Sequence, residues 1–280
     1  MSVKSYKNLD FLNSPDARTI RVLSEFLEPQ RRFRRGGVKN TIVFFGSART
    51  LSPHSARVLL RTTKASIPKK GKPSRKQLAA LRDAENAVVM SRYYRDCMTL
   101  SRLLTEWAKG PDGKQEFLVC SGGGPGIMEA ANRGAKLAKG KSIGLNISLP
   151  FEQSANPYIS KEFDLEFHYF FMRKFWFVYL AKALVIFPGG FGTMDELMEV
   201  LTLLQTLKIR KKLTVVIYGS DFWKRVIDFD YLLEQGVIAK NDLKLFTFID
   251  DPQKAFEFLR YSLTRNYPNK KGSGPLTGTG

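Results

Sequence analysis

Short apolar runs alternate along the chain with longer stretches in which apolar residues recur every three or four positions. The short runs have the length of buried strands, and the longer spacing is typical of helices. The runs predicted to form strands are residues 41–45, 117–120, 141–147, 164–167, 183–187, 213–218 and 246–248. The stretches predicted to form helices are residues 15–35, 77–109, a segment from 127, 171–182, a segment ending at 206, 221–235 and 251–265. This alternation predicts an α/β fold with a doubly wound, mainly parallel, Rossmann-like sheet.

The pattern also predicts how the chain is divided. Residues 1–40 are expected to form an N-terminal helical extension that packs on the outside of the main domain. Residues 41–265 are expected to form a single nucleotide-binding catalytic domain, interrupted by a basic Pro/Gly-rich loop at 68–76. The tail, residues 266–280, is rich in Lys, Gly, Ser and Thr and is expected to be disordered.

Residues 183–206, ALVIFPGGFGTMDELMEVLTLLQT, combine a strand, a glycine turn and a helix. Such a turn places backbone amides at the positive end of a helix, which is a ready site for a phosphate. Glycines also let a ligand approach the backbone closely. We therefore predict that a phosphate binds at Gly189, Gly190, Gly192 and Thr193.

Two carboxylates, Asp195 and Glu196, follow one turn into this helix. A carboxylate here repels a phosphate, so we interpret it as aimed at a part of the ligand that becomes positive during a reaction. An equally simple interpretation is that both side chains only complement the helix dipole.

Arg173 and Lys174 precede the glycine turn and lie among aromatic residues. A cation in such surroundings is costly to bury unless it is paired or lies in a ligand cleft. Arginine also suits bidentate binding of phosphate or carboxylate. Both residues are therefore candidates for the site.

A second strand–glycine–helix unit contains the sequence SGGGPG at residues 121–126. Its candidate ligand-binding residues are Gly122, Gly123, Gly124 and Gly126. The alternative is a tight turn that needs small residues for packing.

Two further candidates follow predicted strands, at the edge where parallel sheets bind ligands. Gly46 and Ser47 come directly after the first strand, and Glu152, Gln153 and Asn156 follow the third, where a base or ribose could be recognised. A polar surface loop explains any one of these three equally well.

The stretch PGGFGTMDE fits the pattern Pro-Gly-Gly-x-Gly-Thr-x-x-Glu, and the Arg-Lys pair begins 23 residues before Glu196. With these motifs, residues 41–206 resemble the LOG (LONELY GUY) family, once labelled lysine decarboxylases. The resemblance implies a hydrolase that cleaves the N-glycosidic bond of nucleoside 5′-monophosphates, of the AMP or cytokinin type, releasing base and ribose 5-phosphate. It also implies that Arg173 and Glu196 are catalytic. No cofactor and no metal are expected.

Two other functions stay open on the sequence alone. One is a non-catalytic nucleotide or cofactor carrier, because a fold does not fix a function. The other is a nucleic-acid-associated protein, because the net charge is +19 and residues 1–80 hold 18 Lys and Arg against 4 Asp and Glu. A solubilising surface that attracts anionic nucleotides explains the charge as well, and the lack of a nucleic-acid-binding motif favours that explanation.

The remaining features concern location and assembly. Two cysteines, no CxxC motif and two histidines provide neither a zinc site nor a disulfide framework. The first ten residues have no apolar signal core, so a cytoplasmic protein is expected. Three cations within residues 169–187 argue against a membrane span there.

The helix ending at 206 is apolar around most of its circumference, which predicts a homodimer or a higher even oligomer.

Overall fold

The computed structural model describes residues 3–68, 72–110, 113–149 and 154–268, and within them the strands form one parallel sheet. Its seven strands are β1 (Asn40–Phe45), β2 (Phe117–Ser121), β3 (Ser142–Ile147), β4 (Asp164–Phe167), β5 (Ala181–Ile186), β6 (Thr214–Tyr218) and β7 (Thr247–Ile249). The predicted α/β class with a parallel sheet is confirmed.

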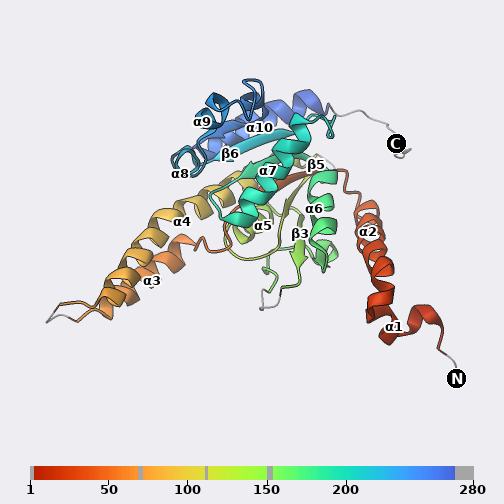
Figure 1. Cartoon of the computed structure of the whole chain (residues 1–280), viewed down its shortest axis with the longest axis horizontal. Helices are drawn as coiled ribbons and strands as arrows, with labels where there is room; N and C mark the ends of the chain where they lie inside the picture. The colour runs from red at the N-terminus through yellow and green to blue at the C-terminus, as the bar shows by residue number, and fades with distance from the viewer. Residues whose placement is uncertain (1–2, 69–71, 111–112, 150–153, 269–280) are drawn as a thin grey trace.

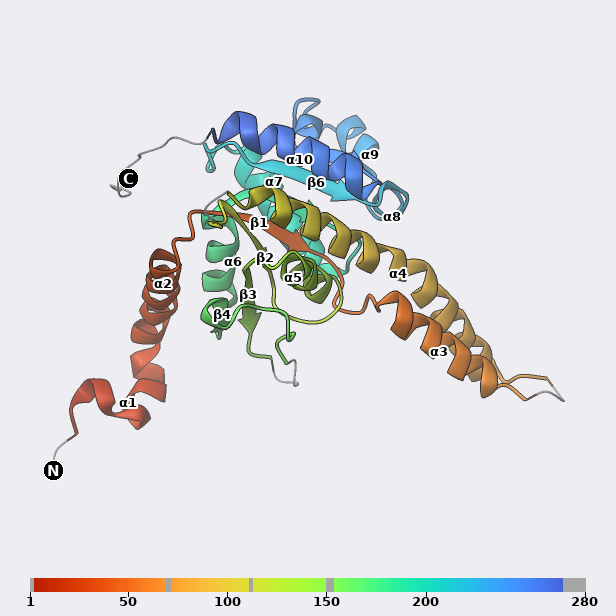
Figure 2. The same ribbon diagram turned by 180° about the vertical axis from the view of Figure 1, so that it is seen from behind.

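Helices cover both faces of this sheet. The α-helices of the described residues, not all of which contact the sheet, are α1 (Leu9–Asn13), α2 (Arg18–Arg35), α3 (Pro53–Ala65), α4 (Arg75–Ala108), α5 (Ile127–Leu137), α6 (Phe170–Tyr179), α7 (Phe191–Gln205), α8 (Ser220–Val226), α9 (Phe229–Glu234) and α10 (Pro252–Asn266). Figure 1 shows α6 and α7 in front of the sheet, and Figure 2, from behind, shows α4, α5 and α10 on the opposite face.

The inner strands are largely apolar because both of their faces are buried, whereas the edge strand β4 alternates between exposed Asp164 and Glu166 and buried Leu165 and Phe167. In β1, Val43 and Phe45 join the core cluster beneath α6 and α7, whereas Ile42 and Phe44 join the cluster beneath α4 and α5. Successive side chains of a strand point to opposite faces, so one unbroken apolar run supplies both clusters.

The strand order is β4-β3-β2-β1-β5-β6-β7. From β1 the chain adds strands outward in one direction, and from β5 it adds them in the other. In such sheets ligands bind at the carboxyl ends of the strands where the order reverses. The ends of β1 and β5 therefore define the place to look for a site.

Two predicted elements differ from the structure. The predicted helix 221–235 is two helices, α8 and α9, because the Asp228 side chain accepts a hydrogen bond from the Tyr231 amide and starts a new helix. The predicted helix 171–182 ends at Tyr179, and Lys182 belongs to β5. Its aromatic residues continue into an apolar strand, so hydrophobicity alone does not mark the boundary.

The sequence analysis made no prediction for α3. Ser52 caps this helix and Pro53 occupies its first turn, which are ordinary signals of a helix start. The helix is amphipathic but short, and only Ala56 in it is buried.

Helix α2 packs on the outside of the sheet against α6. The rings of Phe26 and Phe33 contact Trp176, and the Trp176 indole donates to the Glu25 carbonyl at 3.0 Å. The carboxylate of Glu25 accepts the amide of His168 at 2.7 Å. The N-terminal helix is thus anchored at its C-terminal half, while α1 and the start of α2 project away from the body (Figure 1).

Helix α7 is covered on one side only. Its buried residues are Thr193, Glu196, Leu197 and Val200, whereas Met198 is 37% exposed. Neighbouring Phe171 and Phe175 of α6 are exposed too, and the groove between the two helices is lined by these rings and Leu203. The apolar circumference predicted for this helix is therefore left partly uncovered by its own chain.

Tyr267, directly after α10, donates a hydrogen bond from its hydroxyl to the Lys212 carbonyl. Residues 269–280 of the predicted tail lie outside the described residues. Within the described ranges, no helix is long and apolar enough to cross a membrane.

Candidate functional site

The loop after β1 joins the two glycine turns. The Ser47 amide donates to the Pro188 carbonyl at 3.0 Å, and the Ser47 carbonyl accepts from the Ile127 amide at 3.1 Å. Gly46 allows this approach, since a Cβ there would lie 2.7 Å from the Ile127 side chain. Gly46 and Ser47 therefore hold together the carboxyl ends of β1 and β5 and the start of α5.

The turn at the start of α7 is open on its outer side. Gly190 is the N-cap of the helix, and its carbonyl accepts the amides of Thr193 and Met194. No side chain caps the helix. A Cβ at Gly190 or Gly192 would meet nothing within 4 Å. Glycine inside a helix costs about 1 kcal/mol relative to alanine, so packing gives no reason for Gly192, whereas close approach of a ligand does.

Gly189 serves packing instead. A Cβ there would lie 2.1 Å from the Thr193 hydroxyl oxygen, and Thr193 itself is buried. The four residues predicted to bind phosphate therefore fall into two pairs. Gly190 and Gly192 face open space, whereas Gly189 and Thr193 pack against each other and shape the turn.

The second glycine turn is buried and largely bonded within the protein. The Gly123 amide donates to the Ser121 hydroxyl, and Asn156 donates to the carbonyls of Gly123 and Gly124. Gly126 has a φ of 70° and leaves no room for a Cβ against the Ser47 carbonyl. These contacts explain the glycines by packing, and a direct ligand contact for them stays a prediction.

Arg173 reaches from α6 to the carboxyl ends of β2 and β3. Its Nε donates to the Leu145 carbonyl at 2.8 Å, and its guanidinium lies 5.1 Å from the Phe177 ring. A Cβ on Gly122 would lie 2.5 Å from the arginine Nη2. Gly122 thus makes room for the guanidinium. Burial lowers the pKa of Arg173, opposed by the nearby charge of Glu196.

Lys174 is surrounded by three carboxylates of α7. Its Nζ lies 2.8 Å from Asp195 Oδ2, 2.7 Å from Glu199 Oε2 and 3.7 Å from Glu196 Oε1. Burial lowers the pKa of Lys174, but the hydrogen bonds to Asp195 and Glu199 outweigh it and raise the pKa above its ordinary value. The lysine is therefore a fixed cation that holds the carboxylates in place.

Glu196 is the unusual member of this cluster. It is only 8% exposed, and its Oε2 is buried without a hydrogen-bond partner. Burial raises its pKa to about 7, with Lys174 opposing the rise and Glu199 adding to it. A carboxyl with this pKa can both take and give a proton near neutral pH.

The structure brings Lys174, Asp195 and Glu196 together near the start of α7, with Arg173 close enough for its charge to act on Glu196. It adds Glu199, which the sequence analysis did not single out, although its spacing from Asp195 and Glu196 puts all three on one side of the helix. Glu152 lies outside the described residues. Among the residues that the structure describes, no His, Cys, Asp and Glu group is arranged to hold a metal ion.

Comparison with known proteins gives a family and distant relatives. The family model described as possible lysine decarboxylase matches residues 128–259, just under half of the chain. The pyrimidine/purine nucleotide 5′-monophosphate nucleosidases of Escherichia coli K12 and of Escherichia coli O157:H7 are each 27% identical over 178 residues. The alignment covers 58% of this chain and 37% of each relative, so the chain spans little more than a third of their length.

Solved structures are similar at lower identity. A crystal structure of TM1055 is 20% identical with a TM-score of 0.43, and covers 79% of this chain and 99% of that one. The Moco carrier protein from Chlamydomonas reinhardtii is 17% identical with a TM-score of 0.42. The match covers 81% of this chain and 99% of the carrier protein chain.

Proposed function

We propose that the chain is a LOG-type member of the family whose model is described as possible lysine decarboxylase, and that it hydrolyses the N-glycosidic bond of nucleoside 5′-monophosphates. The products are the free base and ribose 5-phosphate. The nucleosidase relatives act on nucleotide 5′-monophosphates by name, which supports this substrate class. One observation carries the proposal: a buried carboxyl with a pKa of about 7 and an unpartnered oxygen stands beside an open glycine turn.

The phosphate handle is the N-terminus of α7. An anion placed over Gly190 and Gly192 meets the free side of the turn and the positive end of the helix dipole. With the phosphate held there, the sugar extends toward Glu196, which lies one turn into α7.

Glu196 then acts on the reacting carbon of the ribose. When the bond to the base breaks, the ribose becomes oxocarbenium-like and positively charged, as in glycoside hydrolysis. The ionised carboxylate stabilises this charge or takes a proton from the attacking water, whose oxygen bonds to C1′ while the base leaves with a proton. Lys174 keeps the carboxylate in position without forming a close hydrogen bond to it, since the separation is 3.7 Å.

Arg173 is proposed to contact the ribose or the departing base. Its Nε is already bound to the Leu145 carbonyl, which fixes the plane of the guanidinium. The Nη2 end lies over Gly122, at the edge where ligands bind. A role as the orienting partner of Glu196 is less well supported, because the described part of the chain shows Lys174 as the cation within 4 Å of that carboxylate.

The decarboxylase description fits the site poorly. A lysine that forms a Schiff base with a pyridoxal cofactor must lose its proton to react. Lys174 has a raised pKa and is paired with three carboxylates, which keeps it charged.

The proposal is tested by incubating the protein with AMP, GMP, CMP, UMP and a cytokinin riboside 5′-monophosphate, followed by chromatography of the released base and ribose 5-phosphate. Equal amounts of both products from at least one nucleotide are expected. Binding of a nucleotide without any release of base would contradict the proposal and identify a nucleotide-binding protein on the same fold.

A further inference from the structure

Helices α3 and α4 form an arm that leaves the body of the protein. Both views show α3 beside the N-terminal half of α4, with the pair extending away from the sheet (Figures 1 and 2). From Tyr93 onward α4 is packed into the core, but before that point only Ala84 and Ser91 in it are buried. The outer part of the arm is therefore held by contacts between its own two helices.

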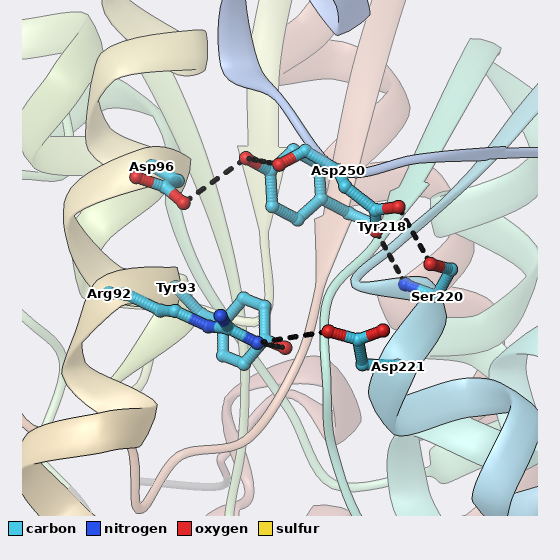
Figure 3. A network of polar contacts seen from close by, with 7 residues as sticks. All are labelled: Arg92, Tyr93, Asp96, Tyr218, Ser220, Asp221 and Asp250. Carbon is cyan, nitrogen blue, oxygen red and sulfur yellow. Dashed lines mark hydrogen bonds and ion pairs between the residues drawn. The ribbon is translucent and has the colours of Figure 1, made fainter.

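The root of the arm is fixed by a polar network at the carboxyl end of β6 (Figure 3). The Tyr218 hydroxyl donates to Asp96 of α4 at 3.1 Å, and Arg92 donates to the Tyr93 hydroxyl at 2.7 Å. Arg92 also lies 3.9 Å from the Asp221 carboxylate of α8. The arm thus projects in a defined direction.

The arm carries an unusual charge. Nine Lys and Arg residues and no Asp or Glu lie between Pro53, where α3 begins, and Asp83. On α3, the side that faces α4 is formed by Ala56, Leu60 and Thr63, which are buried or half-buried. Residues four and seven apart share a helix face. A separate stripe is therefore formed by three exposed cations: Arg57, Arg61 and Lys64.

Helix α4 adds Arg75 and Arg82 on the face turned away from α3, and both are exposed. Within the described residues none of these five cations forms an ion pair within 4 Å of a carboxylate, although Asp83 and Glu85 lie near Arg82 on α4. A charge of this density, held away from the body, needs an explanation beyond solubility.

We propose that the α3–α4 arm binds duplex nucleic acid through its phosphate backbone, independently of base sequence. From Arg57 to Lys64 the helix rises about 10 Å, which spans about three phosphates at 3.4 Å per strand step. Contacts of this kind need cations and no base-reading side chains. This binding is separate from the hydrolysis of mononucleotides and does not depend on it.

The composition of the arm favours a duplex over other anionic partners. No Phe, Tyr or Trp lies between Phe45 and Tyr93. Single-strand binding relies on aromatic stacking, membrane-surface helices insert apolar and aromatic side chains, and protein interfaces centre on aromatic anchors. A second copy of the chain would present an arm of the same charge, which repels.

The test measures binding of the full-length protein to a fluorescein-labelled 20-base-pair DNA duplex of mixed sequence by anisotropy, between 50 and 200 mM salt. The variant Arg57→Gln/Arg61→Gln/Lys64→Gln is compared with a control that removes the same charge from α10, Lys254→Gln/Arg260→Gln/Arg265→Gln. Circular dichroism verifies the fold of both.

Each phosphate contact contributes about −0.9 to the slope of log K against log salt. The α3 variant is expected to reduce the magnitude of this slope by about 2.7 and to weaken binding at 50 mM salt by about tenfold or more. The control should bind like the wild type. A duplex of RNA in place of DNA should bind with a similar slope, and a single strand of the same length should bind less tightly.

Other results would overturn the proposal. Equal losses in the α3 variant and the α10 control would show that total charge, not the arm, determines binding. Absence of duplex binding at 50 mM salt, together with arm-dependent binding to vesicles of phosphatidylserine and phosphatidylcholine, would assign the arm to membranes instead.

Discussion

The raised pKa of Glu196 makes a specific prediction about stability. In the unfolded chain this carboxyl has its ordinary pKa of 4.5, and in the folded protein burial raises it to about 7. The folded protein therefore holds a proton that the unfolded chain has lost between these two pH values. The resulting stabilisation is complete below pH 4.5 and is lost as the pH rises through 7.

The magnitude follows from the two pKa values. A shift of one pKa unit corresponds to about 1.4 kcal/mol, so linkage between pH 5 and pH 8 amounts to about 2 to 3 kcal/mol of the free energy of unfolding. Glu196→Gln removes this titration and keeps the shape of the side chain. The variant should gain about 2 to 3 kcal/mol relative to the wild type on going from pH 5 to pH 8, and should be the more stable protein at pH 8.

Urea denaturation at pH 5, 6, 7 and 8 measures this difference. The control is Glu257→Gln, which removes an exposed carboxylate of α10 outside the cluster around Glu196. A difference between Glu196→Gln and the wild type that stays constant within about 0.5 kcal/mol would refute the reasoning, because it would mean that Glu196 is ionised in the folded protein throughout.

Three further predictions concern the ligand and the assembly. Adenosine should have a kcat/KM about a hundredfold or more below that of AMP in the free-base assay, because several charge-assisted contacts to the 5′-phosphate are lost together. For the same reason 3′-AMP should be a poor substrate. Equal kcat/KM values for adenosine and AMP would exclude the phosphate handle. Gly192→Ala should leave the urea midpoint unchanged but lower kcat/KM about tenfold or more, equivalent to one lost contact of about 1.4 kcal/mol. Gly189→Ala should instead lower the urea midpoint, because its Cβ meets Thr193. Light scattering at micromolar concentration should show a dimer that Phe175→Asp weakens, because Phe175 belongs to the uncovered face of α6 and α7; a monomeric wild type would disprove it.

Much of the fold follows from local pattern. Most strands are compact apolar runs, and the alternation with helices leaves few topologies open. The division of 221–235 into two helices depends on the cap formed by Asp228, which competes with a helix that the apolar spacing alone would continue.

The sequence proposes members of a candidate site but not their arrangement. The glycine turns and the Arg-Lys pair point to the carboxyl ends of the strands, but the sequence cannot tell which glycines have open space beside them. That division depends on tertiary neighbours, such as Arg173 against Gly122 and Thr193 against Gly189. The place of Glu199 beside Lys174 likewise becomes evident only when α6 packs next to α7.

The most direct measurement of the proposed mechanism is turnover of the best nucleoside 5′-monophosphate by the wild type and by Glu196→Gln, with binding of the same nucleotide followed by calorimetry. The account predicts stoichiometric free base and ribose 5-phosphate from the wild type, and turnover at least about a hundredfold lower in the variant, with nucleotide binding retained. A variant that turns over at close to the wild-type rate would contradict the role of Glu196, and a wild type that releases no base from any nucleoside 5′-monophosphate would contradict the activity itself.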